Sequence, residues 1–364
     1  MINVLFVTPI SGNGGIQSWG KKMLSFFSKG EIKLRHVNVS YRRSVLKHET
    51  GIRRPIDGLI DLFNACFDVF GAIKKEKPSL LHTTTSGNIG CLRDFILGRL
   101  AKRNRIPAIL HCHYGCLPND YVRKGIVGFL LRHSLPYYDQ IWVLDKKTFD
   151  YLNAIDKFKG KVYITPNFID VPSDNQIVPK EYKRIAFVGN LVKSKGLFEV
   201  IKAVKDSNCN IVLDIIGPGR EKVVSEMMAL IGDELNKKII VHGRMDNKAT
   251  VDFMKNVDII ALPSYYKSEA FPISILEAMS LGKLVVSTRR AAIPDMLTDL
   301  DGNDCGYFVR EQNSDDIIEA IKWCQTNKHA ADVRCIKAYE KVRSCYDTHI
   351  VMDVYKSLYY KLVK

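Results

Sequence analysis

The sequence predicts an α/β protein built from two doubly wound parallel sheets. Short apolar segments alternate with helical stretches along the chain, as expected of parallel strands covered by helices on both faces. A strand, a glycine-rich loop and a helix open the chain at 2–29, and the same order recurs at 185–206. At 364 residues the chain is long enough for two domains of ordinary size. We expect strands at 2–7, 34–39, 79–83, 107–111, 140–144, 161–164, 185–188, 210–216, 238–242, 258–262, 284–287 and 306–309.

A polar, proline-containing segment at 171–176 separates the two halves and predicts a linker. The first domain is expected to span 1–170 and the second 171–346. A final helix is expected at about 347–362, because Ile350, Val351, Val354 and Leu358 recur at helical spacing.

Charge is unevenly divided between these halves. Residues 1–170 carry 26 Lys/Arg and 13 Asp/Glu, a net charge of +13, whereas residues 171–364 carry 28 and 26, a net of +2. Basic clusters at 42–43, 53–54, 74–75, 102–105 and 123–124 suit an anionic surface, or they are ordinary solvated surface. We favour a membrane over nucleic acid, since no aromatic RNA-binding pattern or zinc-finger spacing is found.

Membrane-spanning and disulfide-rich classes are disfavoured. No run approaches 18 apolar residues, and the first strand leads into a glycine-rich loop rather than a signal-peptide pattern. Nine cysteines without regular spacing indicate free, buried thiols in a reducing compartment. We therefore expect a cytoplasmic protein.

Two carboxylates flank the start of one apolar helix. The helix is expected from about 272 to 281, with Pro272 at the first helical position and Gly282 after the end. Glu277 would then be buried among apolar side chains and need a hydrogen-bonding partner, whereas Glu269 precedes the helix. Free N–H groups and the helix dipole form an anion site at this end. A nucleotide-sugar would fill it; the ordinary alternative is a Glu277 paired with Lys or Arg in an α/β core.

This region resembles the retaining GT-B glycosyltransferases of family 4. The resemblance includes the Glu-x7-Glu element of Glu269 and Glu277, the loop 187–196, the segment 166–170 and the strand end 214–219. It implies a GT-B fold, in which two such domains face each other across a cleft and the last helix, about 347–364, crosses back to the first domain. It further implies that the first domain binds the acceptor and the second the nucleotide-sugar. This sequence has Asn190 where the family usually has Arg. It also has Ala291-Ala292-Ile293-Pro294-Asp295 where the family usually has Gly-Gly-x-Pro-Glu.

The resemblance also implies roles for individual residues. Glu269, His113 and Lys195 are the expected catalytic group: Lys195 stabilises the leaving diphosphate, and Glu269 and His113 orient the sugar. Asn190 supplies no cation, which leaves Lys193 or Arg244 as the second one. Arg93 is the expected acceptor contact. The implied donor contacts are Gly14, Gly15, Gly189, Asn190, Lys195, Gly217, Arg244, Phe271, Pro272, Ile273 and Glu277.

Two sequence motifs resemble metal sites, but neither is expected to bind a metal. On a strand, His111 and His113 share one face and Cys112 the other, and no further Cys/His pair completes a zinc site. Asp299 and Asp301 form a literal D-x-D, but Gly302 and its neighbours indicate a polar turn. We expect no metal and no cofactor.

The expected protein is a retaining glycosyltransferase for polysaccharide biosynthesis, with a UDP-sugar as the favoured donor and GDP-mannose as the alternative. The segment 81–88 with Arg93 resembles members that extend lipid-linked saccharides, so a polyprenyl-diphosphate-linked acceptor at the inner face of the plasma membrane is expected. Two alternatives remain. One is a UDP-N-acetylglucosamine epimerase, which shares the fold. The other is a catalytically silent binding subunit, suggested by Asn190 and Asp295.

Overall fold

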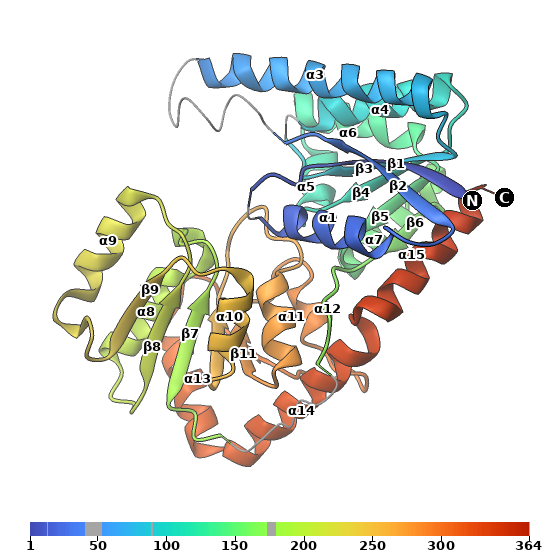
Figure 1. Ribbon diagram of the computed structural model, residues 1–364. Helices are drawn as coiled ribbons and strands as arrows, with labels where there is room; N and C mark the ends of the chain where they lie inside the picture. The colour runs from blue at the N-terminus through green and yellow to red at the C-terminus, as the bar shows by residue number, and fades with distance from the viewer. Residues whose placement is uncertain (13, 41–52, 89, 173–179, 364) are drawn as a thin grey trace. The chain divides into compact units, whose positions relative to one another are not determined.

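The computed structural model describes residues 1–12, 14–40, 53–88, 90–172 and 180–363. Each of the twelve strands expected from the sequence is present, within about three residues at either end. They form two parallel six-stranded sheets (Figure 1), in the orders β2-β1-β3-β4-β5-β6 and β12-β11-β10-β7-β8-β9. The doubly wound α/β prediction is therefore confirmed. Parts of the expected linker at 171–176 and of the clusters at 42–43 and 53–54 lie outside the described residues and side chains.

The chain divides into two compact units: residues 1–167 with 351–364, and residues 168–350. The first unit contains β1 (Ile2–Thr8), β2 (Ile32–Asn38), β3 (Leu80–Thr85), β4 (Ala108–Cys112), β5 (Gln140–Val143) and β6 (Val162–Ile164). Its helices are α1 (Gly15–Phe26), α3 (Arg53–Glu76), α4 (Gly90–Arg103), α5 (Leu117–Val122), α6 (Ile126–Ser134), α7 (Lys146–Asn153) and most of α15 (Thr348–Val363).

The second unit contains β7 (Arg184–Val188), β8 (Val212–Ile216), β9 (Ile239–Gly243), β10 (Ile259–Leu262), β11 (Leu284–Ser287) and β12 (Tyr307–Phe308). Its helices are α8 (Leu197–Asp206), α9 (Glu221–Ile231), α10 (Asn247–Met254), α11 (Ile273–Ser280), α12 (Ile293–Met296), α13 (Ser314–Thr326) and α14 (Lys328–Cys345). Within the ranges that the structure describes, no helix is both long and apolar enough to cross a bilayer.

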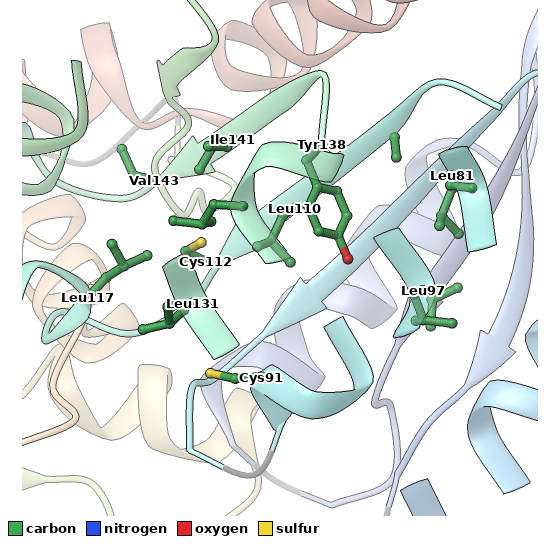
Figure 2. Close-up of a cluster of buried hydrophobic side chains, with 14 of the residues drawn as sticks. Leu81, Cys91, Leu97, Leu110, Cys112, Leu117, Leu131, Tyr138, Ile141 and Val143 are labelled. Atoms are coloured by element: carbon green, nitrogen blue, oxygen red, sulfur yellow. The ribbon is translucent and has the colours of Figure 1, made fainter. Parts of the chain in front are cut away.

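One face of the first sheet carries an apolar core (Figure 2). Leu81, Leu110 and Ile141 on adjacent strands pack against Leu97 of α4 and Leu131 of α6. Because strands alternate their side chains, Cys112 also points into this core, whereas His111 lies on the other face. The expected alternation along this strand is confirmed.

An aromatic layer covers the opposite face. Trp19 of α1 lies 5.6 Å from Phe6 between ring centroids, and Tyr355 of α15 lies 4.8 Å from Trp142. The hydroxyl of Tyr359 shares a 2.6 Å hydrogen bond with Nδ1 of His82. These contacts place the end of the chain on the first sheet.

Every cysteine is a free thiol, as the sequence indicated, and seven of the nine are buried. Burial raises the pKa of the Cys91 and Cys305 thiols to about 12. A thiolate is therefore disfavoured at both positions.

The carboxyl ends of β7 and β8 are joined by a close approach between two glycines. A Cβ atom on Gly217 would lie 1.8 Å from the carbonyl oxygen of Gly189, and Gly217 has φ of +149°. Gly189 has a similar φ of +147°, but a Cβ there meets nothing within 4 Å. Of these two residues, only Gly217 has both a backbone conformation that favours glycine and too little room for a Cβ atom.

We expect Gly217→Ala to destabilise the second unit by at least about 2 kcal/mol more than Gly189→Ala does, because overpacking adds to the strain of the positive φ. Urea unfolding followed by circular dichroism measures both. Gly189→Ala is the matched control, since it brings the same φ without the collision. Equal losses of unfolding free energy in the two variants would mean that β7 and β8 move apart at this end with little cost in free energy.

Candidate active site

A lysine and a carboxylate that are far apart in sequence meet beyond the ends of β7 and β10. Nζ of Lys195 lies 3.5 Å from Oε2 of Glu269, and Oγ of Ser264 donates a 2.7 Å hydrogen bond to the same oxygen. Glu269 is only 6% exposed, so these two donors stabilise a desolvated carboxylate. The structure thus brings together two of the three residues expected to be catalytic, and it adds Ser264, which the sequence analysis missed.

The loop that carries Lys195 is fixed by its neighbours. Lys195 ends a 3₁₀ turn (Lys193–Lys195), and Gly196 follows with φ of 81°. A Cβ on Gly196 would lie 2.4 Å from the carbonyl oxygen of Pro263. The N–H of Tyr265 donates to the Ser194 carbonyl at 2.8 Å. Glycine at 196 therefore lets this loop lie against the segment that bears Ser264.

The N-terminus of α11 opens beside this group, one residue later than expected. Pro272 is the N-cap with ψ of 116°, an extended conformation, so the helix begins at Ile273. Pro272 therefore does not occupy the first helical position. The N–H groups of Ile273 and Ser274 have no partner within the helix because no preceding turn exists. Phe271 is buried against the ring of Tyr346, and it fixes the entry of the chain into the helix.

Glu277 is half-buried, so the expectation that it lies deep among apolar neighbours is wrong. It shares the more open face of α11 with Ile273 and Ser274, because these positions are three and four residues apart. The expected hydrogen-bonding partner exists: Nδ2 of Asn247, at the start of α10, donates to Oε1 of Glu277 at 2.8 Å. Asn247 was missed because nothing in the local sequence links it to a residue thirty positions later.

The glycine-rich strand ends lie in the same unit. The N–H of Gly189 donates to the Ile216 carbonyl at 3.0 Å, and the N–H of Gly217 donates to the Gly243 carbonyl at 2.8 Å. Asn190 follows and is exposed. The two glycines keep side chains away from these strand ends, and both of their N–H groups are hydrogen-bonded within the unit.

Two cations are candidates for the charge that Asn190 lacks. Lys193 forms an ion pair with Glu226 of α9 and also lies over the ring of Phe198. Arg244 is exposed just after β9. To bind a phosphate, Lys193 would have to leave its carboxylate partner Glu226. That Arg244 supplies the second cation stays a prediction.

The departure from the family pattern at 291–295 coincides with an unusual backbone. Ala291 has φ of 48°, in the left-handed region that favours glycine. The N–H of Ala292 donates to the Ala270 carbonyl at 3.1 Å, which ties this turn to the segment before α11. Asp295 itself lies in the short helix α12.

His113 belongs to the first unit and follows β4. Its ring is tilted against those of Trp19 and His111, with centroid distances of 4.5 and 4.1 Å. Burial lowers the pKa of His113 to about 3, and Nε2 has no hydrogen-bonding partner among the residues that the structure describes. A neutral imidazole can orient a hydroxyl, but it does not carry a positive charge near neutral pH.

Gly14 and Gly15 stand at the start of α1. Gly14 is the N-cap, and the N–H of Ser18 donates to its carbonyl at 3.0 Å. A Cβ on Gly14 would lie 2.3 Å from Oε1 of Gln17. The Gln17 side chain therefore lies over this turn, and the helix begins at Gly15.

Arg93 lies on α4 and contacts its own unit. Its guanidinium donates to the Thr84 carbonyl and pairs with Asp94 at 3.0 Å. Asp94 is buried, and desolvation raises the pKa of its carboxyl. Arg93 thus supports the end of β3, and its expected contact with an acceptor stays a prediction.

The D-x-D sequence forms the expected polar turn. Oδ1 of Asp299 accepts hydrogen bonds from the N–H groups of Asp301 and Asn303 at 2.9 and 2.7 Å. Asp301 instead reaches Lys337 at 3.3 Å. No group of three or more His, Cys, Asp or Glu suited to a metal ion occurs within the described ranges.

The second unit matches a known family. Residues 172–342 match the model of the glycosyl transferases group 1, so this segment is similar to that family. An uncharacterized glycosyltransferase of Methanocaldococcus jannaschii is 24% identical over 361 residues, which cover 92% of this chain and 87% of that protein.

Two further proteins are similar. N,N'-diacetylbacillosaminyl-diphospho-undecaprenol alpha-1,3-N-acetylgalactosaminyltransferase of Campylobacter jejuni is 30% identical over 116 residues, 31% of this chain and 29% of that one. The crystal structure of Anabaena HepE in complex with UDP-glucose superposes with a TM-score of 0.73 at 13% identity, covering 98% of this chain and 99% of that one. The likeness to solved glycosyltransferases shows that the fold is GT-B.

We expect the free energy of unfolding to decrease as the pH falls below about 6.5, because three buried histidines resist protonation. Burial holds the pKa of His82 and His111 well below the usual range and lowers that of His113 to about 3. The unfolded chain therefore binds more protons below pH 6.5, and each histidine contributes up to about 1.4 kcal/mol per pH unit.

Urea unfolding at a series of pH values measures this slope. His111→Gln should reduce it, whereas His329→Gln, at an exposed position, should leave it unchanged. A slope that is insensitive to His111 would show that the buried imidazoles do not control acid stability.

Proposed function

We propose that this chain is a retaining glycosyltransferase that moves a sugar from a nucleotide diphosphate to a saccharide acceptor. One observation carries the proposal. The ammonium of Lys195, the buried carboxylate of Glu269 and the N-terminus of α11 belong to one sheet end, where ligands of open α/β sheets bind. A diphosphate with a sugar on one side and a ribose on the other would use all three.

The diphosphate would accept hydrogen bonds from the N–H groups of Ile273 and Ser274, with Lys195 neutralising the charge that develops on the leaving group. Glu277, on the open face of α11, would accept hydrogen bonds from the ribose hydroxyls. Asn247 already donates to one Glu277 oxygen, so it would hold the carboxylate in place for the nucleotide. A UDP-sugar is favoured over GDP-mannose, because UDP-glucose is the ligand named for HepE.

The reaction we propose retains the configuration of the sugar. The anomeric carbon–oxygen bond to the phosphate breaks, the acceptor oxygen bonds the same face, and the leaving phosphate takes the acceptor proton. Both Ser264 and Lys195 contact the Glu269 oxygen, which favours an orienting role for Glu269 over attack on the sugar. Double displacement through a carboxylate is the alternative. Neutral His113 would hydrogen-bond the sugar.

A lipid-linked saccharide is the acceptor we favour, in surface polysaccharide biosynthesis. The Campylobacter relative is named for transfer to a diphospho-undecaprenol acceptor, which supports this choice. The basic excess of residues 1–170 suits an acceptor that is presented at an anionic membrane. Arg93 stays the candidate acceptor contact, although it would have to leave its contacts to Thr84 and Asp94.

Two alternative functions, an epimerase and a silent binding subunit, differ from a transferase in how they release the nucleotide. A UDP-N-acetylglucosamine epimerase would not depend on an acceptor for turnover, whereas a transferase releases the nucleotide diphosphate as the acceptor is consumed. A silent binding subunit would bind the donor without hydrolysis or transfer. The departures from the family pattern at Asn190 and Asp295 motivate the silent subunit. Following nucleotide release with and without acceptor separates these functions.

A thermal-shift screen of UDP-, GDP-, ADP- and TDP-sugars should identify the donor, because a bound ligand stabilises the folded chain by mass action. We expect Glu277→Gln to weaken binding of that donor by about 1.5–3 kcal/mol, the contribution of a hydrogen bond to a charged group. Titration calorimetry measures the change. Glu319→Gln, on the exposed surface of α13, is the matched control. Unchanged affinity in folded Glu277→Gln would remove this residue from the donor site.

We expect transfer to continue in the presence of EDTA, because Lys195 and a helix N-terminus supply the positive potential that a metal supplies in other transferases. Donor turnover is measured with and without the chelator. Loss of turnover on chelation and its recovery with manganese would contradict this expectation. Asp299→Asn would then test whether the turn rearranges to bind the ion.

A further inference from the structure

The long helix α3 exposes a continuous apolar stripe. Ile56, Leu59, Phe63 and Phe67 are 56%, 41%, 57% and 74% exposed. They are three or four residues apart, so they form one face of the helix. Lys74 continues the stripe, and its ammonium lies 4.3 Å from the ring centroid of Phe70. Single exposed apolar residues are ordinary, but four in a row on one helix face mark an interaction surface.

The other two faces of α3 differ from this apolar stripe: one is buried in the core and one is acidic. Leu62, Cys66, Val69 and Ile73 are buried in the core of the first unit. Asp57, Asp61 and Asp68 recur at spacings of four and seven on a third face. The acidic side chains of α3 are thus separated from its apolar stripe, whereas Lys74 and Lys75 end the helix. The apolar stripe therefore adjoins basic rather than acidic side chains at the end of the helix.

A second apolar projection belongs to the same helical layer. Val122, Ile126 and Phe129 are 64%, 78% and 54% exposed at the junction of α5 and α6. Arg123 and Lys124 lie between them and are exposed. Helices α3, α4, α5 and α6 all bury their inner faces in one core, and Figure 1 shows α3, α4 and α6 stacked on the same side of the first sheet.

Charge favours a lipid surface over a second copy of this chain. The exposed basic residues of this layer include Lys75, Arg99, Lys102 and Arg103, and residues 1–170 carry a net charge of +13. Two copies of the first unit, each with this basic excess, would repel each other on self-association. An anionic bilayer would instead attract the lysines and arginines while accepting the phenylalanines among its lipid head groups.

We propose that the stripe formed by Ile56, Leu59, Phe63 and Phe67 of α3, together with Val122, Ile126 and Phe129, docks the first unit on an anionic bilayer. The inference deepens the proposed function and rests on it only for the membrane-linked acceptor. Charge brings the chain to the surface, and insertion of the aromatic side chains holds it there. High salt should therefore weaken binding without abolishing it, since salt screens charge but not apolar contact.

Co-sedimentation of the full chain with vesicles tests the proposal, using phosphatidylcholine alone and phosphatidylcholine mixed with phosphatidylglycerol. We expect the mixed vesicles to be preferred, and Phe63→Ser with Phe67→Ser to weaken partitioning at least about tenfold, because two exposed aromatic rings no longer insert. Val333→Ser with Ile336→Ser is the matched control: both residues are 42% exposed on α14 of the second unit. The control should partition like the unaltered chain.

A second measurement is independent of a loss of binding. Tryptophan introduced as Phe67→Trp should be quenched by brominated lipid, whereas Val333→Trp should not. Equal partitioning of the double-serine variant and the unaltered chain would overturn the proposal. So would a concentration-dependent dimer, detected by light scattering, that the double-serine variant loses. Donor binding by the double-serine variant is measured in parallel, so that a failure of membrane docking is distinguished from a failure of the proposed function.

Discussion

The buried carboxylate of Glu269 is the constraint on which the candidate site depends. An ionised side chain that is 6% exposed is stable only with partners, since an uncompensated charge in a protein interior costs several kcal/mol. Ser264 and Lys195 supply them, and each is placed by its own contacts. The Ser264 carbonyl accepts from Thr288 at 2.5 Å, which joins the segment after β10 to the end of β11. The contacts of Glu269 and Ser264 together link the ends of three strands.

The first unit is stabilised by a different arrangement. Its second face is covered by α1 and the C-terminal helix, whose aromatic side chains surround His82 and His111. Packing desolvates these imidazoles and keeps them neutral, as their lowered pKa values indicate. The same layer holds His113 against Trp19. The ring that we propose to contact the sugar is therefore oriented by the contacts that hold the last helix in place.

Strand positions could be predicted from the sequence because burial on both faces of a parallel sheet leaves continuous apolar runs. Side-chain environments could not be predicted equally well. Glu277 was expected to be buried because its neighbours in sequence are apolar, yet the face of α11 that carries it is the more open one. Pro272 was misplaced by one residue because proline fixes φ but not ψ.

Local sequence patterns could not predict which residues hydrogen-bond to Glu269 and Glu277. Ser264 and Asn247 contact carboxylates that come from other segments of the chain, and only the fold sets those distances. The exposed stripe of α3 was missed for a similar reason. A helix with apolar residues on two faces has the same composition whether one face or both are covered, and tertiary packing decides which.

Several residues with positive φ lie at the strand ends of the second unit. Gly189, Gly196 and Gly217 all have positive φ, and Ala291 takes a left-handed conformation without being glycine. Strain of this kind persists only where surrounding contacts enforce it, and it concentrates at ligand-binding sites. Here the contacts that enforce it also position Lys195, Glu269 and the start of α11. The geometry is therefore set before any ligand arrives, so a donor diphosphate would meet donors that need little further ordering.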